Sequence, residues 1–497
     1  MSNKSKSSSD NNDFMSTFID AGGTLIMVLL KAVFDGLVFL FNRYVFKERQ
    51  SAEIKKIERK DLDCKKIASN KSEFGYSVTQ RRPLSTDELD KKAHTAIIGA
   101  SGSGKTVLLD VLMYDDMHRN KPIIYVDPKG DNCTMNDFIN MCRDANREFL
   151  IFNEYYNGAG ACKLNPIKEG SINHIVDRIS SAFTWSEEHY KNLCYEALRD
   201  AVTELKEKNQ LITFSNIYNM LNQLTDDKSN KDVGYKKKDI QGILTRIKNI
   251  TDSDFGPKLE GANAYSFEEI RKTNKCVYIG LSVLGYAETA KALGKIFLGD
   301  LSHSIYEIYK VSTNQTLSKQ VPTGIYIDEL SAVITGQFVE ILNKCRKAKV
   351  ELNFAFQTPS DLLRVDQYFC DQILDSSSNW FIFKQRMEDG ANLFSMSLGT
   401  KEGKKLTKRV DEGQEQNMGS LREVEENIAH SNIIKNLKVG QAVLLRQYPT
   451  RIDLVNIKYI DPDILEENVK KLEMWGYINQ LKNPVAIQKH ASSDLLN

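Results

Sequence analysis

Short apolar runs alternate with helical patterns through the middle of the chain. A run of this length that is apolar throughout is typical of a strand buried on both faces of a sheet. Strands of this kind, separated by helices, predict a doubly wound, mostly parallel α/β sheet that binds its ligand at the carboxyl ends of the strands. The predicted strands are Thr95–Ile98, Pro122–Asp127, Phe149–Phe152, Cys276–Leu281, Gly324–Asp328, Leu352–Phe356 and Trp380–Phe383.

The strand pattern stops between residues 172 and 262, where long helical patterns take over. Stretches such as His174–Ile179 and Ala197–Val202 place apolar residues at helical spacing. We therefore expect an all-α domain at 172–262, inserted into a sheet domain whose two parts span 91–171 and 263–460.

The N-terminal region divides into three parts of different composition. Residues 1–17 are mostly small and polar and predict a disordered tail. Residues 18–46 are largely apolar, interrupted by Lys31 and Asp35, which can pair on a helix. This segment predicts a membrane anchor, and the basic residues after it place the body in the cytoplasm. An interfacial helix, an anchor formed only in an oligomer, a soluble packing helix and a cleaved signal peptide are the alternatives. The charge-rich residues 47–90 predict a linker.

Composition narrows the function classes only slightly. The chain of 497 residues carries 67 basic and 66 acidic residues, a net charge of +1, which excludes a uniformly basic surface but allows a local basic lining for nucleic acid. Eight scattered cysteines without a C-x-x-C pair favour reduced thiols over a zinc site, with an exported disulfide framework as the alternative. Residues 461–497 predict a C-terminal tail that begins as a helix.

A glycine-rich loop follows the first predicted strand and precedes a helical pattern. It matches the phosphate-binding pattern G-x-x-x-x-G-K-[ST], in which backbone N–H groups surround the phosphates, Lys105 reaches the β and γ oxygens and Thr106 ligates Mg²⁺. The pattern predicts ATP and Mg²⁺ as ligands, against the alternative of an ordinary glycine-rich turn. The predicted nucleotide-binding residues are Gly99, Ala100, Ser101, Gly102, Ser103, Gly104, Lys105 and Thr106.

Two acids end a later predicted strand. We expect Asp328 to hold Mg²⁺ and Glu329 to polarise the attacking water, whereas a simple helix cap is the alternative. Gln357 ends the next strand along the chain and is predicted to sense the γ-phosphate or the water. Arg346 stands in a basic helix end and is predicted to act on the nucleotide of a neighbouring subunit, unless it only complements the helix dipole.

Two further segments carry charge. Asp127–Asp131 (Asp-Pro-Lys-Gly-Asp) follows the second predicted strand, where it either senses phosphates, faces a pore or forms a plain turn. Lys401–Arg409 is strongly basic and is either a solvated loop or a contact for nucleic-acid phosphates.

In this order, the motifs resemble those of the type IV secretion coupling proteins, the ATPases of conjugation. The resemblance covers roughly residues 90–450. It is carried by the phosphate loop, Asp127–Asp131, Leu164–Pro166, Asp328–Leu330, Arg346, Gln357, Ser420–Glu426 and Ile434–Leu437.

This resemblance implies a RecA-like P-loop NTPase, anchored in the inner membrane as a homohexamer, with an all-α domain between its two Walker motifs. It implies that Arg346 is an arginine finger. It also implies that the protein delivers a relaxase bound to DNA, single-stranded in this family, to a type IV secretion channel. The chain departs from the family, which commonly has two membrane helices, in offering only residues 18–46. FtsK- or HerA-like translocases and a docking receptor that does not pump DNA are therefore alternative functions.

Overall fold

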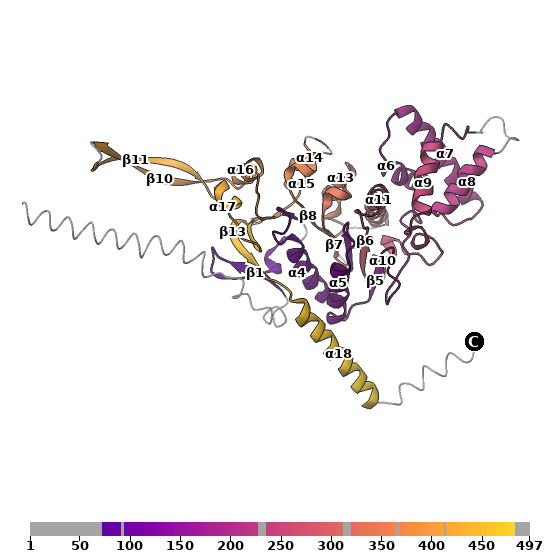
Figure 1. Cartoon of the computed structure of the whole chain (residues 1–497), viewed down its shortest axis with the longest axis horizontal. Coiled ribbons are helices and arrows are strands. Elements are labelled where there is room, and N and C mark those ends of the chain that lie inside the picture. The colour runs from indigo at the N-terminus through magenta and orange to yellow at the C-terminus, as the bar shows by residue number, and fades with distance from the viewer. Residues whose placement is uncertain are drawn as a thin grey trace, which may run out of the picture. The chain divides into compact units, whose positions relative to one another are not determined.

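The computed structural model describes residues 72–482, apart from 91–93, 227–234, 312–319, 364–365, 367 and 412–413. In this part, eleven strands form one sheet in the order β2-β1-β13-β12-β9-β3-β8-β7-β4-β6-β5, and β10 and β11 form a second sheet (Figure 1). The strands are β1 (Glu73–Ser77), β2 (Arg82–Ser85), β3 (Thr95–Ile98), β4 (Ile123–Asp127), β5 (Phe149–Phe152), β6 (Cys276–Gly280), β7 (Thr323–Ile327), β8 (Val350–Phe356), β9 (Asn379–Ile382), β10 (Thr400–Asp411), β11 (Gln414–Asn427), β12 (Gln441–Gln447) and β13 (Thr450–Ile457).

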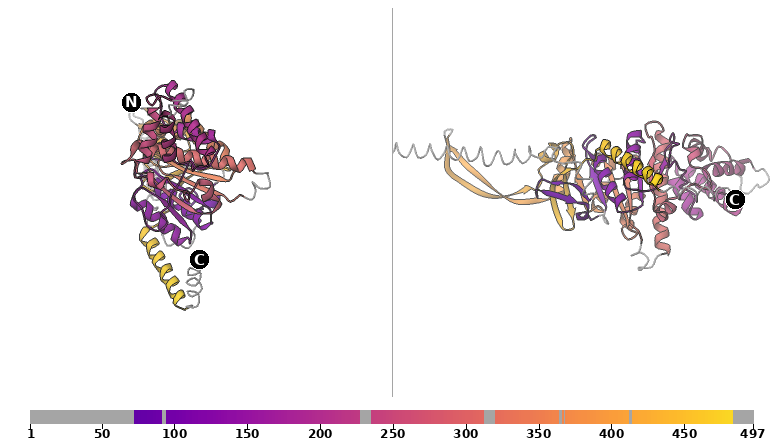
Figure 2. Two further views of the ribbon diagram at one scale, coloured as in Figure 1. Left: turned by 90° about the vertical axis from the view of Figure 1, so that its right-hand side faces the viewer. Right: turned by 90° about the horizontal axis from the view of Figure 1, so that it is seen from below.

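Helices cover both faces of the large sheet (Figure 2). They are α4 (Lys105–His118), α5 (Asn132–Asp144), α6 (Ile172–Ser181), α7 (Glu188–Glu207), α8 (Phe214–Asp226), α9 (Gln241–Thr251), α10 (Phe267–Lys272), α11 (Ala287–Val311), α13 (Gln337–Cys345), α14 (Pro359–Leu363), α15 (Phe369–Asp375), α16 (Glu388–Ser397), α17 (Ser431–Lys435) and α18 (Pro462–Lys482), with short 3-10 turns at Thr86–Glu88, Gly256–Lys258 and Leu330–Ala332.

The strands from β9 to β5 are parallel to their neighbours, which confirms the predicted mostly parallel sheet. Successive side chains of a strand point to opposite faces, so a strand with helices on both faces must be apolar at every position. In β3, Ile97 belongs to the buried cluster that includes apolar side chains of α4 and α5, whereas Ala96 and Ile98 belong to the cluster that includes those of α11 and α13. This two-sided burial is the reason that the strands read as continuous apolar runs.

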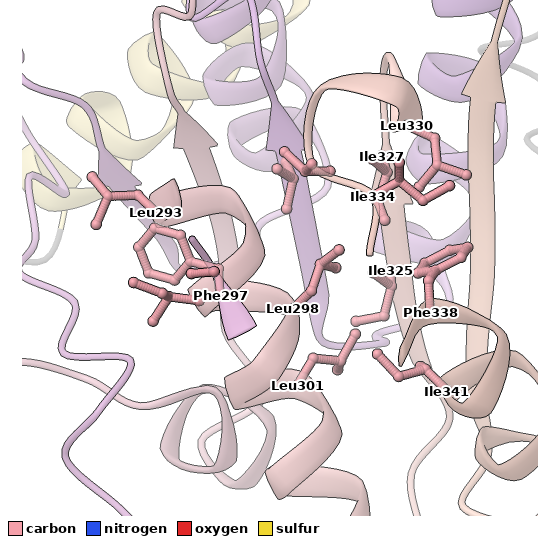
Figure 3. Packing of buried hydrophobic residues seen from close by; sticks show 14 of the residues in the cluster. Leu293, Phe297, Leu298, Leu301, Ile325, Ile327, Leu330, Ile334, Phe338 and Ile341 are labelled. Carbon is pink, nitrogen blue, oxygen red and sulfur yellow. The ribbon is translucent and has the colours of Figure 1, made fainter. Parts of the chain in front are cut away.

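Figure 3 shows how the second face is filled. Leu298 and Leu301 of α11 point toward Ile325 of β7. Phe338 of α13 lies beside the same strand on the same face of the sheet, and all four side chains are buried (Figure 3). The contact holds α13, the helix that leads into Arg346, against the strand that leads into Asp328.

The described residues between β5 and β6 contain helices α6 to α10 and no named strand, as the helical patterns predicted. The Leu-Asn-Pro segment begins this insertion. Asn165 Nδ2 donates to the carbonyl of Ile212 at 2.8 Å. Arg178 of α6 donates to the carbonyl of Pro166 and forms a buried ion pair with Asp300 of α11, with Nη1 and Oδ1 3.2 Å apart. The insertion is therefore tied to the sheet domain by buried polar contacts.

The prediction of a linker at 47–90 is wrong for its last part. Strand β1 pairs antiparallel with β13, and β2 pairs with β1, so residues 73–85 extend the large sheet. Phe74 and Leu84 are fully buried. These strands could not be predicted from the sequence because they are short and contain few apolar residues among their polar ones.

Of the two alternatives for Lys401–Arg409, the loop is wrong, because these residues lie in β10, and the contact with nucleic-acid phosphates stays a prediction. This strand pairs antiparallel with β11 through the register Thr400↔Asn427 to Thr407↔Ser420, and the pair projects as a ribbon from the rest of the described fold (Figures 1 and 2). The start of the predicted C-terminal tail forms α18, whose Leu465 and Val469 are buried.

The predicted tail at 1–17 and the predicted anchor at 18–46 lie outside the described residues. Among the residues that the structure does describe, no helix combines the length and the hydropathy needed to cross a membrane.

Candidate nucleotide site

The phosphate loop lies at the carboxyl end of β3 and leads directly into α4. Gly104 caps the helix with a φ of 111°, a left-handed value that favours glycine. A Cβ on Gly99 would lie 2.5 Å from the Cβ of Phe383, so the loop passes too close to its neighbour for any side chain there. Glycine is thus needed at both ends of the loop for steric reasons.

Lys105 is buried beneath the loop. Its Nζ donates to the carbonyls of Gly99 at 2.7 Å and Ala100 at 3.3 Å. Burial lowers the pKa of Lys105, and the carboxylates of Asp328 and Glu329 oppose this effect. These hydrogen bonds hold the side chain at the loop, and its contact with the β and γ phosphate oxygens stays a prediction.

Asp328 follows β7 and meets the loop across β8, because the sheet order in this region is β3-β8-β7. Its Oδ2 accepts from Thr106 Oγ1 at 3.0 Å and contacts the ammonium of Lys129 at 2.8 Å. The Asp328 side chain is only 2% exposed. A hydroxyl and a carboxylate oxygen are ligands that Mg²⁺ prefers, and the carboxylate already attracts a cation in this structure. The two residues therefore fit the predicted Mg²⁺ role.

Glu329 and Gln357 are brought together as the sequence suggested. Gln357 Nε2, at the end of β8, lies 3.2 and 3.1 Å from the two carboxylate oxygens of Glu329. Ser331 Oγ donates to Oε1 of the same carboxylate at 3.0 Å. Glu329 has a φ of 68°, which is uncommon for a residue with a side chain and typical of a functional position. These contacts hold the Glu329 carboxylate in one orientation.

The segment Asp127–Asp131 belongs to the same edge of the sheet. Its Lys129 reaches Asp328, as described above, and the Lys129 N–H donates to Asp127 Oδ1 at 2.9 Å. The Tyr278 hydroxyl donates to Asp127 Oδ2 at 2.7 Å. Burial raises the pKa of Asp127 to about 6, partly offset by these two hydrogen bonds. The segment is therefore more than a plain turn, because it supplies a cation to the site.

Two protein-family profiles match the chain in succession. The helicase HerA central domain matches residues 83–297, and the TraM recognition site of TraD and TraG matches residues 322–441. The type 4 coupling protein DotL of Legionella pneumophila is 27% identical over 186 residues, which cover 34% of this chain and 23% of DotL.

The bacterial conjugative coupling protein TrwBdeltaN70 has a similar fold, with a TM-score of 0.57 at 16% identity over 81% of this chain and 91% of TrwBdeltaN70. The chain is therefore similar to type IV coupling proteins in the family profiles that it matches, in part of its sequence and in its fold. A second structure, TrwB in complex with ADP and Mg²⁺, gives a TM-score of 0.52 at 17% identity over 78% of this chain and 88% of that one. At these identities, the likeness to the TrwB structures concerns the fold.

Arg346 does not join the other predicted site residues. It follows α13 and precedes β8, so it lies at the amino edge of the parallel strands, opposite the phosphate loop. Its Nη2 is 3.8 Å from Asp90 Oδ2, and its side chain is 57% exposed. Within one chain, the guanidinium is therefore at the wrong edge of the sheet to contact a nucleotide held by its own loop.

A group of basic residues beside the phosphate loop was not among the residues predicted from the sequence. A pocket of about 390 Å³ lies beside the loop, and its lining includes Lys384, Arg386 and Lys438. The Ala100 N–H donates to the Lys384 carbonyl at 3.0 Å, so the residues after β9 support the loop directly. Their position in the sequence could have indicated this role, because Lys384 and Arg386 follow an apolar strand and therefore lie at the same carboxyl edge. These three cations make this side of the phosphate loop favourable for an anion.

Proposed function

We propose that the chain is an ATP-hydrolysing type IV coupling protein that moves DNA toward a secretion channel. The observation that carries this proposal is the meeting of the phosphate loop, the Asp328 carboxylate and the Glu329–Gln357 pair at one edge of a parallel sheet. A protein that only binds nucleotide has no need for an oriented acid beside its metal-holding acid. The fold of TrwB and the order of the two family profiles support the coupling role.

The residues divide the work of hydrolysis between them. Loop N–H groups and the Lys105 ammonium bind the phosphates, and Thr106 and Asp328 hold Mg²⁺. Bound Mg²⁺ supplies positive charge that stabilises the phosphoryl oxygens. Glu329 orients a water and accepts its proton, while Gln357 keeps the carboxylate aimed at that water.

Arg346 completes the site of a neighbouring subunit in a homohexamer. Its position at the opposite edge of the sheet and its exposure support an action in trans. Guanidinium groups supplied in this way stabilise charge in the transition state and raise the hydrolysis rate by about 10³–10⁵-fold. A lone subunit is accordingly a poor ATPase.

The cargo and the location are proposed from the resemblance to the type IV secretion coupling proteins. The substrate is DNA, single-stranded and bound to a relaxase, and the acceptor is a type IV secretion channel. Residues 18–46 anchor the protein in the inner membrane, and the catalytic body lies in the cytoplasm, as the charges that flank this segment support. The matched part of the chain spans about a quarter of the length of DotL.

The deciding experiment measures ATP hydrolysis by the full-length chain with and without single- and double-stranded DNA. We expect DNA to stimulate hydrolysis and Lys105→Ala to abolish it. A conjugation assay with Glu329→Gln then tests whether hydrolysis is needed for transfer. Activity that no DNA stimulates would reject the motor and favour a docking receptor. Stimulation without any effect of Glu329→Gln on transfer would favour a translocase of the HerA kind outside conjugation.

A further inference from the structure

A buried histidine lies at the amino edge of the sheet. It precedes β3, whereas the phosphate loop follows β3 at the opposite edge. His94 directly precedes β3, is 1% exposed and has a φ of 62°. Its Nδ1 accepts the N–H of Leu352 in β8 at 3.2 Å. Because Nδ1 accepts, Nε2 carries the proton, and it donates to the carbonyl of Leu342 in α13 at 3.0 Å. One ring thereby joins β3, β8 and α13.

The helix that His94 holds is the one that ends at Arg346. Leu342 lies in the last turn of α13, and the sulfur of Cys345 is 3.4 Å from His94 Nε2. Arg346 is the next residue and caps the helix, and its guanidinium faces Asp90, which lies shortly before His94 in the chain. The segment before β3 therefore contacts both the backbone that carries Arg346 and the guanidinium itself.

The backbone of His94 is strained, which indicates that its contacts matter. A residue with a side chain in the left-handed region costs on the order of 1 kcal/mol or more and persists where its surroundings hold it there. Burial lowers the pKa of His94 to about 4, and Arg346 adds to this lowering, so the ring is neutral near pH 7 and keeps one donor and one acceptor. A neutral ring satisfies both of its partners at once.

We propose that His94 is a positioning residue for hydrolysis in the neighbouring subunit, acting through Arg346, and not for the nucleotide site of its own chain. This inference rests on the proposed function, in which Arg346 acts in trans. The loop residues of the same chain are fixed by other contacts, namely those of Lys105 with the loop carbonyls and of Thr106 with Asp328. Loss of the His94 hydrogen bonds leaves those contacts intact but frees the end of α13.

The test uses mixed assemblies of full-length chains. Arg346→Ala subunits keep an intact site and lack the guanidinium, whereas Glu329→Gln subunits keep the guanidinium and lack the catalytic acid. Mixing them is expected to restore ATP hydrolysis. His94→Phe is then placed in one partner at a time. In the Glu329→Gln partner, which supplies the guanidinium, we expect it to lower the restored rate at least about tenfold, since a misplacement of about 1 Å can cost 10²-fold. In the Arg346→Ala partner we expect no more than about a twofold change.

His303→Phe is the matched control, because His303 is also buried but lies in α11, and it should leave the restored rate unchanged from either partner. His94→Gln keeps a donor and an acceptor, so it should show the same asymmetry at smaller size, and it serves where the Phe chain does not fold.

Equal loss from both partners, or no loss from either, overturns the inference. If the mixture of Arg346→Ala and Glu329→Gln subunits, with His94 unchanged, restores no ATP hydrolysis, Arg346 does not act in trans. In that case the hexameric part of the proposed function fails, and the failure does not depend on His94.

Discussion

Lys129→Met is expected to remove the ammonium that contacts the metal-holding acid. The Lys129 Nζ lies 2.8 Å from Asp328 Oδ2, and the side chains are 52% and 2% exposed. Breaking a fully buried ion pair costs about 3–5 kcal/mol, and breaking an exposed one costs about 0.2–1 kcal/mol. Since one partner is buried and the other is half in solvent, we expect the variant to lose about 2 kcal/mol of unfolding free energy.

Mg²⁺ held by Asp328, as we propose, would compete with the Lys129 ammonium for this carboxylate. In the variant, Mg²⁺ has no competitor, and nucleotide without Mg²⁺ has one cation fewer nearby. Both effects raise the ratio of the Kd measured in EDTA to the Kd measured with Mg²⁺, and we expect this ratio to grow about tenfold, which corresponds to about 1.4 kcal/mol.

The assay combines urea unfolding of the full-length chain with titration of a fluorescent nucleotide analogue in Mg²⁺ and in EDTA. Lys121→Met is the matched control, because Lys121 forms buried ion pairs with Asp116 at 3.0 Å and Glu351 at 2.6 Å on other elements. It should lower stability at least as much and leave the Mg²⁺ effect on binding unchanged. If Lys129→Met also leaves this ratio unchanged, the ammonium and Mg²⁺ do not share Asp328.

Three shorter predictions concern the same fold. Gly99→Ala brings a Cβ to within 2.5 Å of Phe383 Cβ, so it should cost about 1–3 kcal/mol in thermal unfolding and weaken nucleotide binding; unchanged values would mean that the loop shifts freely. Gln357→Ala releases the carboxylate of Glu329 and should lower kcat about 10²-fold in a steady-state ATPase assay, while a matching rise in nucleotide Kd would argue for a binding role instead. The pKa of His94 is about 4 in the folded chain against an ordinary 6.5, so as the pH falls, the imidazole is protonated in the unfolded chain before it is protonated in the folded chain. Stability from this group is therefore complete above pH 6.5 and falls by up to about 3 kcal/mol toward pH 4; urea midpoints across this range should lose that step in His94→Gln, and an identical profile would contradict it.

The parallel strands and the site at their carboxyl ends could be predicted because burial on both faces leaves a continuous apolar signal. Asp328 and Gln357 follow two such strands, β7 and β8, which are adjacent in the sheet. Residues at the ends of adjacent parallel strands meet at one edge, so their approach to the loop follows from the order of the strands. Only the strand order itself had to come from the structure.

The antiparallel end of the sheet could not be predicted in this way. Strand β1 pairs with β13 from the other end of the sheet domain, as in the register Tyr76↔Asn456. Such strands carry polar residues, and their partners are distant in sequence, so neither composition nor spacing indicates the pairing. The contacts of Lys129 with Asp328 and of His94 with Leu342 also join residues that are distant in sequence, so no motif indicates them.

In the proposed ring, the carboxyl edge of the sheet binds the nucleotide of its own subunit, and the amino edge carries groups that act on the next subunit. Strand β8 leads into Gln357 at its carboxyl end, on the side of the phosphate loop, and is preceded by Arg346, which we propose acts on the next subunit. Strand β3 likewise runs from His94 at the amino edge to the phosphate loop. At about 3.3 Å per residue, the seven residues of β8 span roughly 20 Å, and both strands are buried and hydrogen-bonded on each side. Loss of the His94 side chain leaves this backbone pairing in place, so it can displace Arg346 without moving the phosphate loop. In the proposed ring, each of these strands therefore positions groups for two different subunits, one group at each of its ends.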